Sequence, residues 1–217
     1  MGIFAVLSAS AQDWANLARY RAENEAVGLP APGEKRVVFM GNSITEGWRK
    51  ARPGFFYPHT SNIGRGISGQ VTPQMLVRFR QDVVALQPSA VVILAGTNDI
   101  AGNQGPSTLE MIMDNLASMA EIAKENGIKP ILCSVLPAYD YRWKPGIEPA
   151  PKIVRLNGMI RTYCTEHGIE YLDFHTAMKD SRNGLKEEYT TDMVHVTPAG
   201  YDVMTRLVNE AIERVLQ

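Results

Sequence analysis

Three side chains in this sequence, Ser43, Asp192 and His195, have the chemistry that an activated serine nucleophile requires. A serine hydroxyl is a poor nucleophile at neutral pH, so it needs an imidazole to take its proton and a carboxylate to hold that imidazole in the right tautomer. Because Asp192 and His195 lie three positions apart, a single backbone bend can bring the carboxylate to the far nitrogen of the ring. The pattern predicts a serine hydrolase in which Ser43 is the nucleophile, His195 the base and Asp192 the carboxylate that orients the base.

Such chemistry also needs donors for the oxyanion that forms when the serine attacks an acyl carbon, and one such donor contributes roughly 3 kcal/mol to catalysis. We expect three donors: the backbone N–H groups of Ser43 and Gly69 and the side-chain amide of Asn98. Glycine suits position 69 because a side chain would crowd a backbone that approaches the substrate closely. The structural alternatives are a plain turn glycine and an asparagine that caps its loop. Thr97 and Asp99 are expected to hold that loop by side-chain to backbone hydrogen bonds.

Short β-branched runs alternate along the chain with amphipathic segments, which is typical of a parallel sheet covered by helices on both faces. The expected strands are residues 36–40, 60–63, 90–94, 130–135 and 170–173. The expected helices are residues 14–26, 73–86, 109–126, 150–167 and 198–216, with Gly127 and Gly168 as C-caps of two of them. Ligands of such sheets bind beyond the carboxyl ends of the strands, and every candidate residue above follows a strand.

Four sequence blocks resemble those of a known family, the GDSL or SGNH hydrolases. They are Gly41-Asn42-Ser43-Ile44, Gly66-Ile67-Ser68-Gly69, Gly96-Thr97-Asn98-Asp99 and Asp192-Met193-Val194-His195. The resemblance covers the chain from about residue 35 onward, and it departs from the family at Asn42, where the usual first block has Asp. It implies an α/β class, three-layer α/β/α sandwich with a five-stranded parallel, flavodoxin-like sheet. It also implies hydrolysis of esters or thioesters through an acyl-enzyme, without a cofactor.

Other catalytic classes fit the sequence less well. An α/β-hydrolase has its serine in a G-x-S-x-G elbow, but Thr45 stands here where that elbow has glycine. The remaining histidines lack the motif context: His59 and His167 are expected at the surface, and His175 is expected to cap or pack the turn after the last strand. A zinc cluster could be written from Asp192, His195, Asp173 and His175, but no H-E-x-x-H signature accompanies it, so we expect no metal. The G-x-G-x-x-G match at residues 64–69 follows a second strand and lacks an acidic ribose partner.

Composition restricts the partners and the location of the protein. With 217 residues, of which 45% are hydrophobic, the chain can form one α/β domain, expected over residues 12–217. A net charge of −1 without a basic cluster argues against a nucleic-acid partner, and no apolar run is long enough to span a membrane. Residues 1–11 end in the A-x-A form of a signal-peptidase site. We therefore hypothesise a signal-peptide remnant and an extracytoplasmic (periplasmic or secreted) enzyme, the alternative being a flexible start of a cytoplasmic one.

The substrate is suggested by aromatic residues in a proline-containing loop. Tyr139, Tyr141 and Trp143 occupy alternate positions, so in an extended conformation they would share one face and could contact a sugar or an acyl group. Trp48 and Arg65 are further candidates for substrate binding. The hypothesis is a carbohydrate esterase that hydrolyses short acyl esters, and acetyl esters in particular, of a small-molecule or glycan substrate. The alternatives are a lysophospholipase or thioesterase with a longer acyl pocket and, outside enzymes, a glycan-binding pseudoenzyme.

Overall fold

The computed structural model describes residues 13–217, and their five strands form one parallel sheet in the order β2-β1-β3-β4-β5. The expected segment 1–11 lies outside the described residues. The strands are β1 (Val37–Gly41), β2 (Asn62–Gly66), β3 (Ala90–Leu94), β4 (Lys129–Cys133) and β5 (Glu170–Leu172). All five expected strands are therefore present within a few residues, and the α/β/α sandwich expected from the sequence is confirmed.

Side chains along each strand point alternately to the two faces of the sheet, which divides the core into two layers. In β1, the side chains of Val38 and Met40 pack on one face, whereas those of Val37 and Phe39 pack on the other. Both sets are buried, since successive side chains of a strand point to opposite faces and both faces of this sheet are covered. The strands consequently read as continuous apolar runs.

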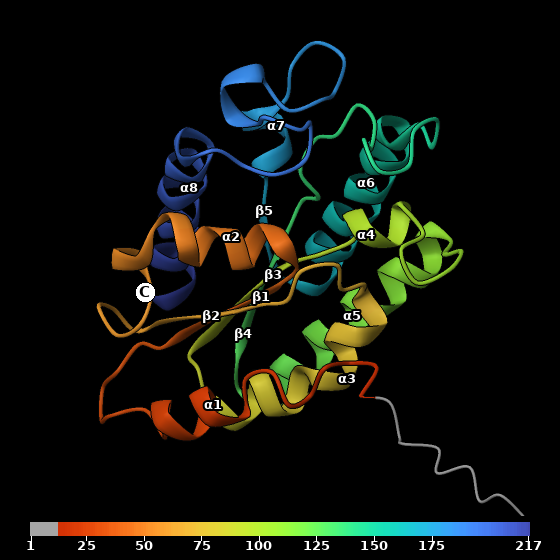
Figure 1. Ribbon diagram of the computed structural model, residues 1–217. Coiled ribbons are helices and arrows are strands. Elements are labelled where there is room, and N and C mark those ends of the chain that lie inside the picture. Colours follow the sequence, from red (N-terminus) through yellow and green to blue (C-terminus); the bar gives the residue numbers. More distant parts are fainter. Residues whose placement is uncertain (1–12) are drawn as a thin grey trace, which may run out of the picture.

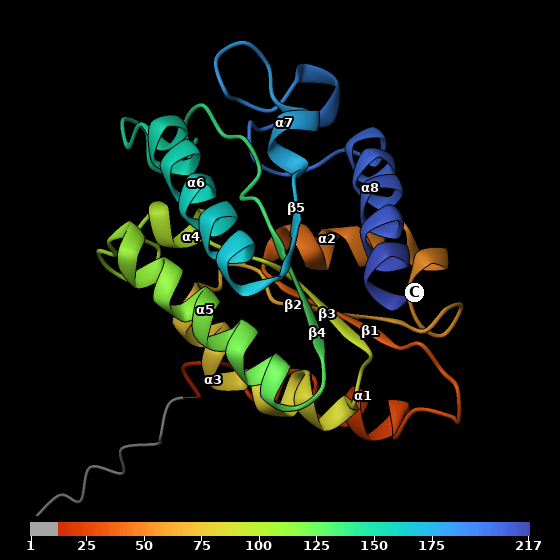
Figure 2. The same cartoon turned by 180° about the vertical axis from the view of Figure 1, so that it is seen from behind.

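Two groups of helices cover the two faces, as the opposite views in Figures 1 and 2 show. One face carries α2 (Ser43–Ala51) and α8 (Pro198–Leu216), and the other carries α3 (Thr72–Asp82), α5 (Leu109–Glu125) and α6 (Pro149–His167). Shorter helical segments are α1 (Arg21–Val27), α4 (Thr97–Ile100), α7 (Phe174–Met178) and the 3₁₀ turns 53–55, 84–86 and 187–189. Gly168 ends α6 in a left-handed conformation, as expected, and Gly127 follows the end of α5.

The expected helix over residues 14–26 is wrong in its first half. Only Arg21–Val27 is helical, because Asn16 has a positive φ of 54° and the preceding residues form turns. The Asp13 carboxylate accepts hydrogen bonds from the backbone N–H groups of Leu17 and Ala18, at 2.7 and 3.0 Å. Local side-chain bonding of this kind competes with helix formation.

The strand register places the expected site residues side by side. Gly41 at the end of β1 is paired with Gly66 of β2 and with Leu94 of β3. Ser43, Gly69 and Asn98 therefore follow three adjacent strands at the same edge of the sheet. This edge lies where the chain reverses its direction of winding, between β1 and β3, which is where open α/β sheets bind ligands.

Candidate active site

Ser43, His195 and Asp192 form a continuous hydrogen-bonded chain at the carboxyl edge of the sheet. Nδ1 of His195 lies 2.6 Å from Asp192 Oδ2, and Nε2 of the same ring lies 3.1 Å from Ser43 Oγ. Because a carboxylate only accepts hydrogen bonds, Nδ1 carries the proton and Nε2 is left to accept from the serine hydroxyl. The geometry is that of a serine whose proton can move to an imidazole.

The turn from Asp192 to His195 is stabilised by the Asp192 side chain itself. Its Oδ1 accepts hydrogen bonds from the backbone N–H groups of Val194, at 3.0 Å, and His195, at 2.7 Å. Met193 between them has a φ of 73°, a left-handed conformation that these bonds help to maintain. Partial burial raises the pKa of Asp192, but the bonds from His195 and Val194 outweigh it and leave the pKa below its ordinary value. The carboxylate is thus ionised when it faces the imidazole.

Asn42 positions Ser43 by capping the helix that begins there. The Asn42 Oδ1 atom accepts a hydrogen bond of 3.1 Å from the backbone N–H of Ile44, and the Asn42 side chain is buried. The aspartate that the family usually has at this position can supply the same acceptor. Asparagine in its place therefore preserves the helix cap. Ser43 is the first residue of α2, and its backbone N–H donates no hydrogen bond within residues 13–217.

Glycine at position 66 allows β2 to end close to the start of the Ser43 helix. A Cβ atom there would lie 2.3 Å from the backbone nitrogen of Glu46 and 2.7 Å from the Asn42 carbonyl oxygen.

Glycine is required at position 69 for a different reason. A Cβ atom at Gly69 would meet no described atom within 4 Å, but its φ of +79° is one that other residues rarely adopt. The positive φ is thus a conformational reason for glycine at position 69, beside the expected close approach of a substrate, which stays a prediction.

The other two expected donors lie in connected loops. The Gly69 N–H donates no hydrogen bond within the described part of the chain. Asn98, which is buried in α4, donates one hydrogen bond from Nδ2 to the Gln70 carbonyl oxygen at 2.9 Å. An amide nitrogen carries two hydrogens, and no second acceptor for Nδ2 occurs among residues 13–217. Three N–H donors are accordingly unused within the described protein.

Two charged side chains that the sequence analysis did not single out hold these loops together. Glu46, on α2, accepts two hydrogen bonds from Ser68, the residue before Gly69. Arg78, which is fully buried on α3, donates to the carbonyl oxygens of Gly41 and Arg65 at 3.0 and 2.8 Å. It also donates to Gln70 Oε1 at 2.6 Å and forms an ion pair of 3.0 Å with Asp82. Arg78 thereby connects the ends of β1 and β2 to the loop after β2.

Thr97 and Asp99 hold the Asn98 segment, as expected, but mainly by different partners. Asp99 Oδ1 accepts hydrogen bonds from the backbone N–H and the hydroxyl of Thr72, at 2.9 and 2.6 Å. Burial raises the pKa of Asp99 above its ordinary value. The Thr97 hydroxyl lies 2.9 Å from the hydroxyl of Tyr141, which is a side-chain pair rather than a side-chain to backbone bond.

Comparison with known proteins assigns the family. A sequence model of the GDSL-like lipase/acylhydrolase family matches residues 39–203, which include all the residues of the hydrogen-bonded chain. This chain belongs to that family. A crystal structure of a protein assigned as an acylhydrolase from Bacteroides fragilis has 47% sequence identity and a TM-score of 0.92, over 95% of this chain and 100% of that one. The family and fold expected from the four sequence blocks are thus confirmed.

More distant curated relatives are larger proteins. An acetylxylan esterase from Xylanibacter ruminicola is 25% identical over 223 residues, covering 85% of this chain and 45% of its own length. An uncharacterised lipoprotein from Bacillus subtilis is 30% identical over 126 residues, covering 51% of this chain and 52% of its own length. This acylhydrolase-family chain spans about half the length of the curated relatives it matches.

Three of the residues expected to bind substrate are buried, so that expectation is wrong for them. Trp48 is 1% exposed and its ring packs in the core between Phe55 and Tyr201. Arg65 is 1% exposed and donates to Asn24 Oδ1 at 2.7 Å and to the adjacent Gly64 carbonyl. Tyr141 is 0% exposed.

The loop with the alternate aromatic residues is irregular, and this explains why Tyr141 points inward. Tyr139 and Trp143 are 49% and 46% exposed, and only these two could meet a ligand at the surface. Trp143 stacks on Tyr141 with ring centroids 4.9 Å apart. The Tyr141 N–H instead bonds to the adjacent Asp140 carboxylate at 2.8 Å, so the strand-like alternation assumed from the sequence does not apply.

A polar hollow adjoins the turn that carries the Asp192–His195 pair. Its volume is about 650 Å³. Thr191 and Met193 of the turn line it, and the other lining residues are Arg142, Asp180, Arg182, Leu185, Lys186, Glu187, Glu188 and Thr190. Six of these ten residues carry charge, three of each sign, and only Leu185 and Met193 are apolar. The hollow beside the turn is therefore lined mainly by polar and charged side chains.

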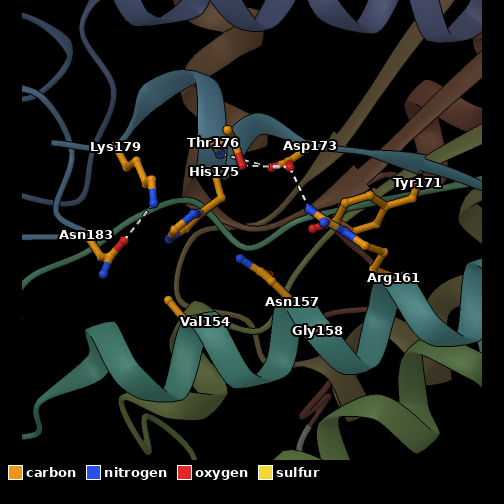
Figure 3. A pocket seen from close by; sticks show the side chains of 10 residues that line it. All are labelled: Val154, Asn157, Gly158, Arg161, Tyr171, Asp173, His175, Thr176, Lys179 and Asn183. Atoms are coloured by element: carbon orange, nitrogen blue, oxygen red, sulfur yellow. Dashed lines mark hydrogen bonds and ion pairs between the residues drawn. The ribbon is translucent and has the colours of Figure 1, made fainter. Parts of the chain in front are cut away.

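A second hollow of about 360 Å³ lies between α6 and α7, beyond the end of β5 (Figure 3). It contains His175 and Asp173, which an alternative zinc cluster would have combined with Asp192 and His195. Instead Asp173 forms an ion pair of 2.8 Å with Arg161 and caps α7, while His175 packs within α7 as expected. Within residues 13–217 no three His, Cys, Asp or Glu residues gather as a metal site.

Proposed function

We propose that this chain is a serine esterase in which Ser43 is the nucleophile, His195 the general base and Asp192 the residue that orients the base. The observation that carries the proposal is the continuous chain from Asp192 through both ring nitrogens of His195 to Ser43 Oγ. Serine, histidine and carboxylate in this order are the parts needed for acyl transfer, and they come from a family of acylhydrolases.

The reaction follows from the positions of the protons. His195 Nε2 takes the Ser43 hydroxyl proton as Oγ attacks the ester carbon, and the imidazolium is stabilised by the ionised Asp192. The same Nε2 then gives the proton to the departing alcohol, which leaves the acyl group on Ser43. A water molecule, deprotonated by Nε2, releases the carboxylic acid and restores the serine.

The oxyanion is assigned to the three unused donors: the backbone N–H groups of Ser43 and Gly69 and the second amide hydrogen of Asn98. They follow three adjacent strand ends, and each lacks a partner within residues 13–217. Donors that are already fixed in place need little reorganisation when charge develops, and removing one costs about 10²- to 10³-fold in kcat.

For the substrate we propose short acyl esters, and in particular acetyl groups on a carbohydrate. The polar hollow beside Met193 supports a hydroxyl-rich leaving group, and the similarity to an acetylxylan esterase supports the same class. Exposed aromatic rings such as Trp143 commonly contact sugars, so Trp143 and Tyr139 remain candidates for the binding surface. The alternative, a lysophospholipase or thioesterase, predicts activity that rises steadily with acyl chain length.

For the location we propose an extracytoplasmic enzyme. The support is the A-x-A sequence at residues 9–11 and the similarity to a lipoprotein. No helix in the described part of the chain is long and apolar enough to cross a membrane. Fractionation of the native organism tests the location, and full-length protein found only in the cytoplasm would contradict it.

The deciding experiment compares wild type with Ser43→Ala on p-nitrophenyl acetate, butyrate and octanoate, with folding checked by circular dichroism. We expect turnover that is fastest for acetate and that falls by roughly 10⁴-fold or more in the variant. Equal turnover by both proteins would exclude the serine mechanism. Glycan binding that survives Ser43→Ala, without turnover of any ester, would instead identify a glycan-binding pseudoenzyme.

A further inference from the structure

A chain of side-chain hydrogen bonds leads from the exposed loop around Trp143 to Asn98. The Trp143 Nε1–H donates to Asn103 Oδ1 at 3.2 Å. Asn103 Nδ2 donates to Asn98 Oδ1 at 3.0 Å, and Asn98 Nδ2 donates to the Gln70 carbonyl oxygen at 2.9 Å. Two amide side chains are thus bracketed by an indole at one end and a backbone carbonyl at the other.

The direction of this chain is fixed by its two ends. An indole N–H can only donate and a carbonyl oxygen can only accept, whereas an asparagine side chain offers both roles and can turn over by 180°. With Trp143 donating, the atom of Asn103 that faces it must be oxygen, so the nitrogen of Asn103 faces Asn98. With Gln70 accepting, the nitrogen of Asn98 must face the loop of Gly69.

We propose that Asn103 is a positioning residue that sets the orientation of the Asn98 amide, and that Trp143 sets the orientation of Asn103 in turn. The inference rests on the proposed function of Asn98 as an oxyanion donor. If the Asn98 amide turned over, its oxygen would face the Gln70 carbonyl, and it would present an acceptor where the reaction needs a donor.

The positions of the two asparagines are fixed separately from their side-chain orientation. The backbone N–H of Asn103 donates to the Asn98 carbonyl oxygen at 3.0 Å, and Trp143 is supported by stacking on Tyr141. Substitutions that alter only the polarity of the side-chain bonds can therefore keep the backbone in place. Asn103 is exposed, which lowers the risk that its replacement prevents folding.

Asn103→Asp is the decisive variant, because it keeps the shape of the side chain and the acceptor for Trp143 but removes the donor to Asn98. We expect kcat for p-nitrophenyl acetate to fall by about 10- to 100-fold, less than the 10²- to 10³-fold loss of an oxyanion donor, with KM within threefold. Gln104→Glu is the matched control. It adds the same charge one residue away and keeps the acceptor used by Trp14, so kcat should change by less than twofold.

Trp143→Phe keeps a ring on Tyr141 but removes the indole N–H, and we expect a smaller fall in kcat, of two- to tenfold. A raised KM with unchanged kcat would overturn the role of Trp143 and make it a substrate-binding residue. Equal kcat in Asn103→Asp and Gln104→Glu would overturn the role of Asn103.

A measurement without substrate separates this proposal from the proposed function. In ¹H–¹⁵N spectra, the side-chain amide signals of Asn98 should shift in Asn103→Asp and in Trp143→Phe but stay in place in Gln104→Glu. Unshifted Asn98 signals in the first two variants would overturn the proposal even in an active enzyme. Turnover that is insensitive to Ser43→Ala would instead contradict the serine mechanism, while the spectra still decide how Asn98 is oriented.

Discussion

Glu46 Oε2 accepts hydrogen bonds from both the backbone N–H and the hydroxyl of Ser68, at 2.9 and 2.5 Å. Glu46 lies one turn after Ser43 on α2, and Ser68 is followed directly by Gly69. The carboxylate consequently fixes the distance between the nucleophile and the loop whose N–H we assign to the oxyanion. Lys50, on the same helix, binds the other carboxylate oxygen at 2.8 Å and is itself exposed.

Removal of this carboxylate should lower activity more than removal of its lysine partner. Hydrogen bonds to charged groups contribute about 1.5–3 kcal/mol, so Glu46→Ala should lower kcat by tenfold or more as the Gly69 loop becomes mobile. Lys50→Ala removes only an exposed ion pair and should leave kcat within twofold. Steady-state kinetics on p-nitrophenyl acetate measures both, and equal effects of the two substitutions would show that Glu46 does not position the loop.

The same carboxylate should make stability depend on pH in the acid range. Partial burial raises the pKa of Glu46, but hydrogen bonds from Lys50 and Ser68 outweigh it and lower the pKa from 4.5 to about 2. Since the folded-state pKa is the lower one, the stabilisation is complete above pH 4.5 and is lost as the pH falls through about 2. Urea unfolding between pH 5 and pH 2 should show a smaller loss of stability in Glu46→Gln than in wild type. If the free energy of unfolding falls with pH by the same amount in both proteins, the pKa of Glu46 is not lowered in the folded state.

The strands and the meeting of Ser43, His195 and Asp192 could be predicted from this sequence because both depend on local pattern. Buried strands appear as apolar runs, and Ser43, Asp192 and His195 occur in short blocks of recognisable spacing. The buried roles of Arg65 and Arg78 could not be predicted, because arginine is almost never buried unless it is paired, and two of the four partners of Arg78 are backbone carbonyls on two strands, which no sequence pattern marks. Tyr141 was expected at the surface for a similar reason, since alternation indicates a shared face only if the segment is extended.

The short helices could not be predicted from the sequence either. The helices α4 and α7 have four and five residues, too few to produce a periodic pattern, and they are held by tertiary contacts. Asp173 caps α7 through a 2.9 Å bond to the Thr176 N–H, a signal that a search for caps after strands could have found. Glu46 could have been suspected from its position on the helix of Ser43, but its partner Ser68 is known only once β2 is placed beside β1.

Asn42 should be replaceable by the aspartate that is usual in the family, but not by alanine. Asn and Asp cap helices about equally well, whereas loss of a cap costs about 1 kcal/mol. We expect Asn42→Ala to lower the free energy of unfolding by that amount and to lower kcat, since Ser43 begins the capped helix. Asn42→Asp should retain kcat within a few-fold. Chemical denaturation and kinetics of both variants test this, and a more severe loss in Asn42→Asp than in Asn42→Ala would exclude capping as the role of the side chain.

Gly69 should be sensitive to backbone conformation rather than to size. Its φ is +79°, and a left-handed conformation costs other residues about 1–2 kcal/mol. Gly69→Ala should therefore lower the melting temperature and kcat together, because the loop can relieve the strain only by moving the N–H. Gly69→Asn should be milder, since asparagine tolerates this region better. If alanine is the better tolerated of the two, the positive φ is not what requires glycine.

Arg78 should act on activity through backbone positions as well as on stability. Arg78→Met leaves the fully buried Asp82 without its cation, and breaking a buried pair in this way costs about 3–5 kcal/mol. Adding Asp82→Leu removes the stranded charge and should recover much of the free energy of unfolding. It cannot restore the hydrogen bonds to the carbonyls of Gly41 and Arg65, which hold the ends of β1 and β2 just before the Ser43 helix and the Gly69 loop. We therefore expect the double variant to regain stability in urea but to keep a kcat at least tenfold below that of wild type. If the double variant regains both stability and kcat, Arg78 serves only to neutralise Asp82 and does not position the backbone.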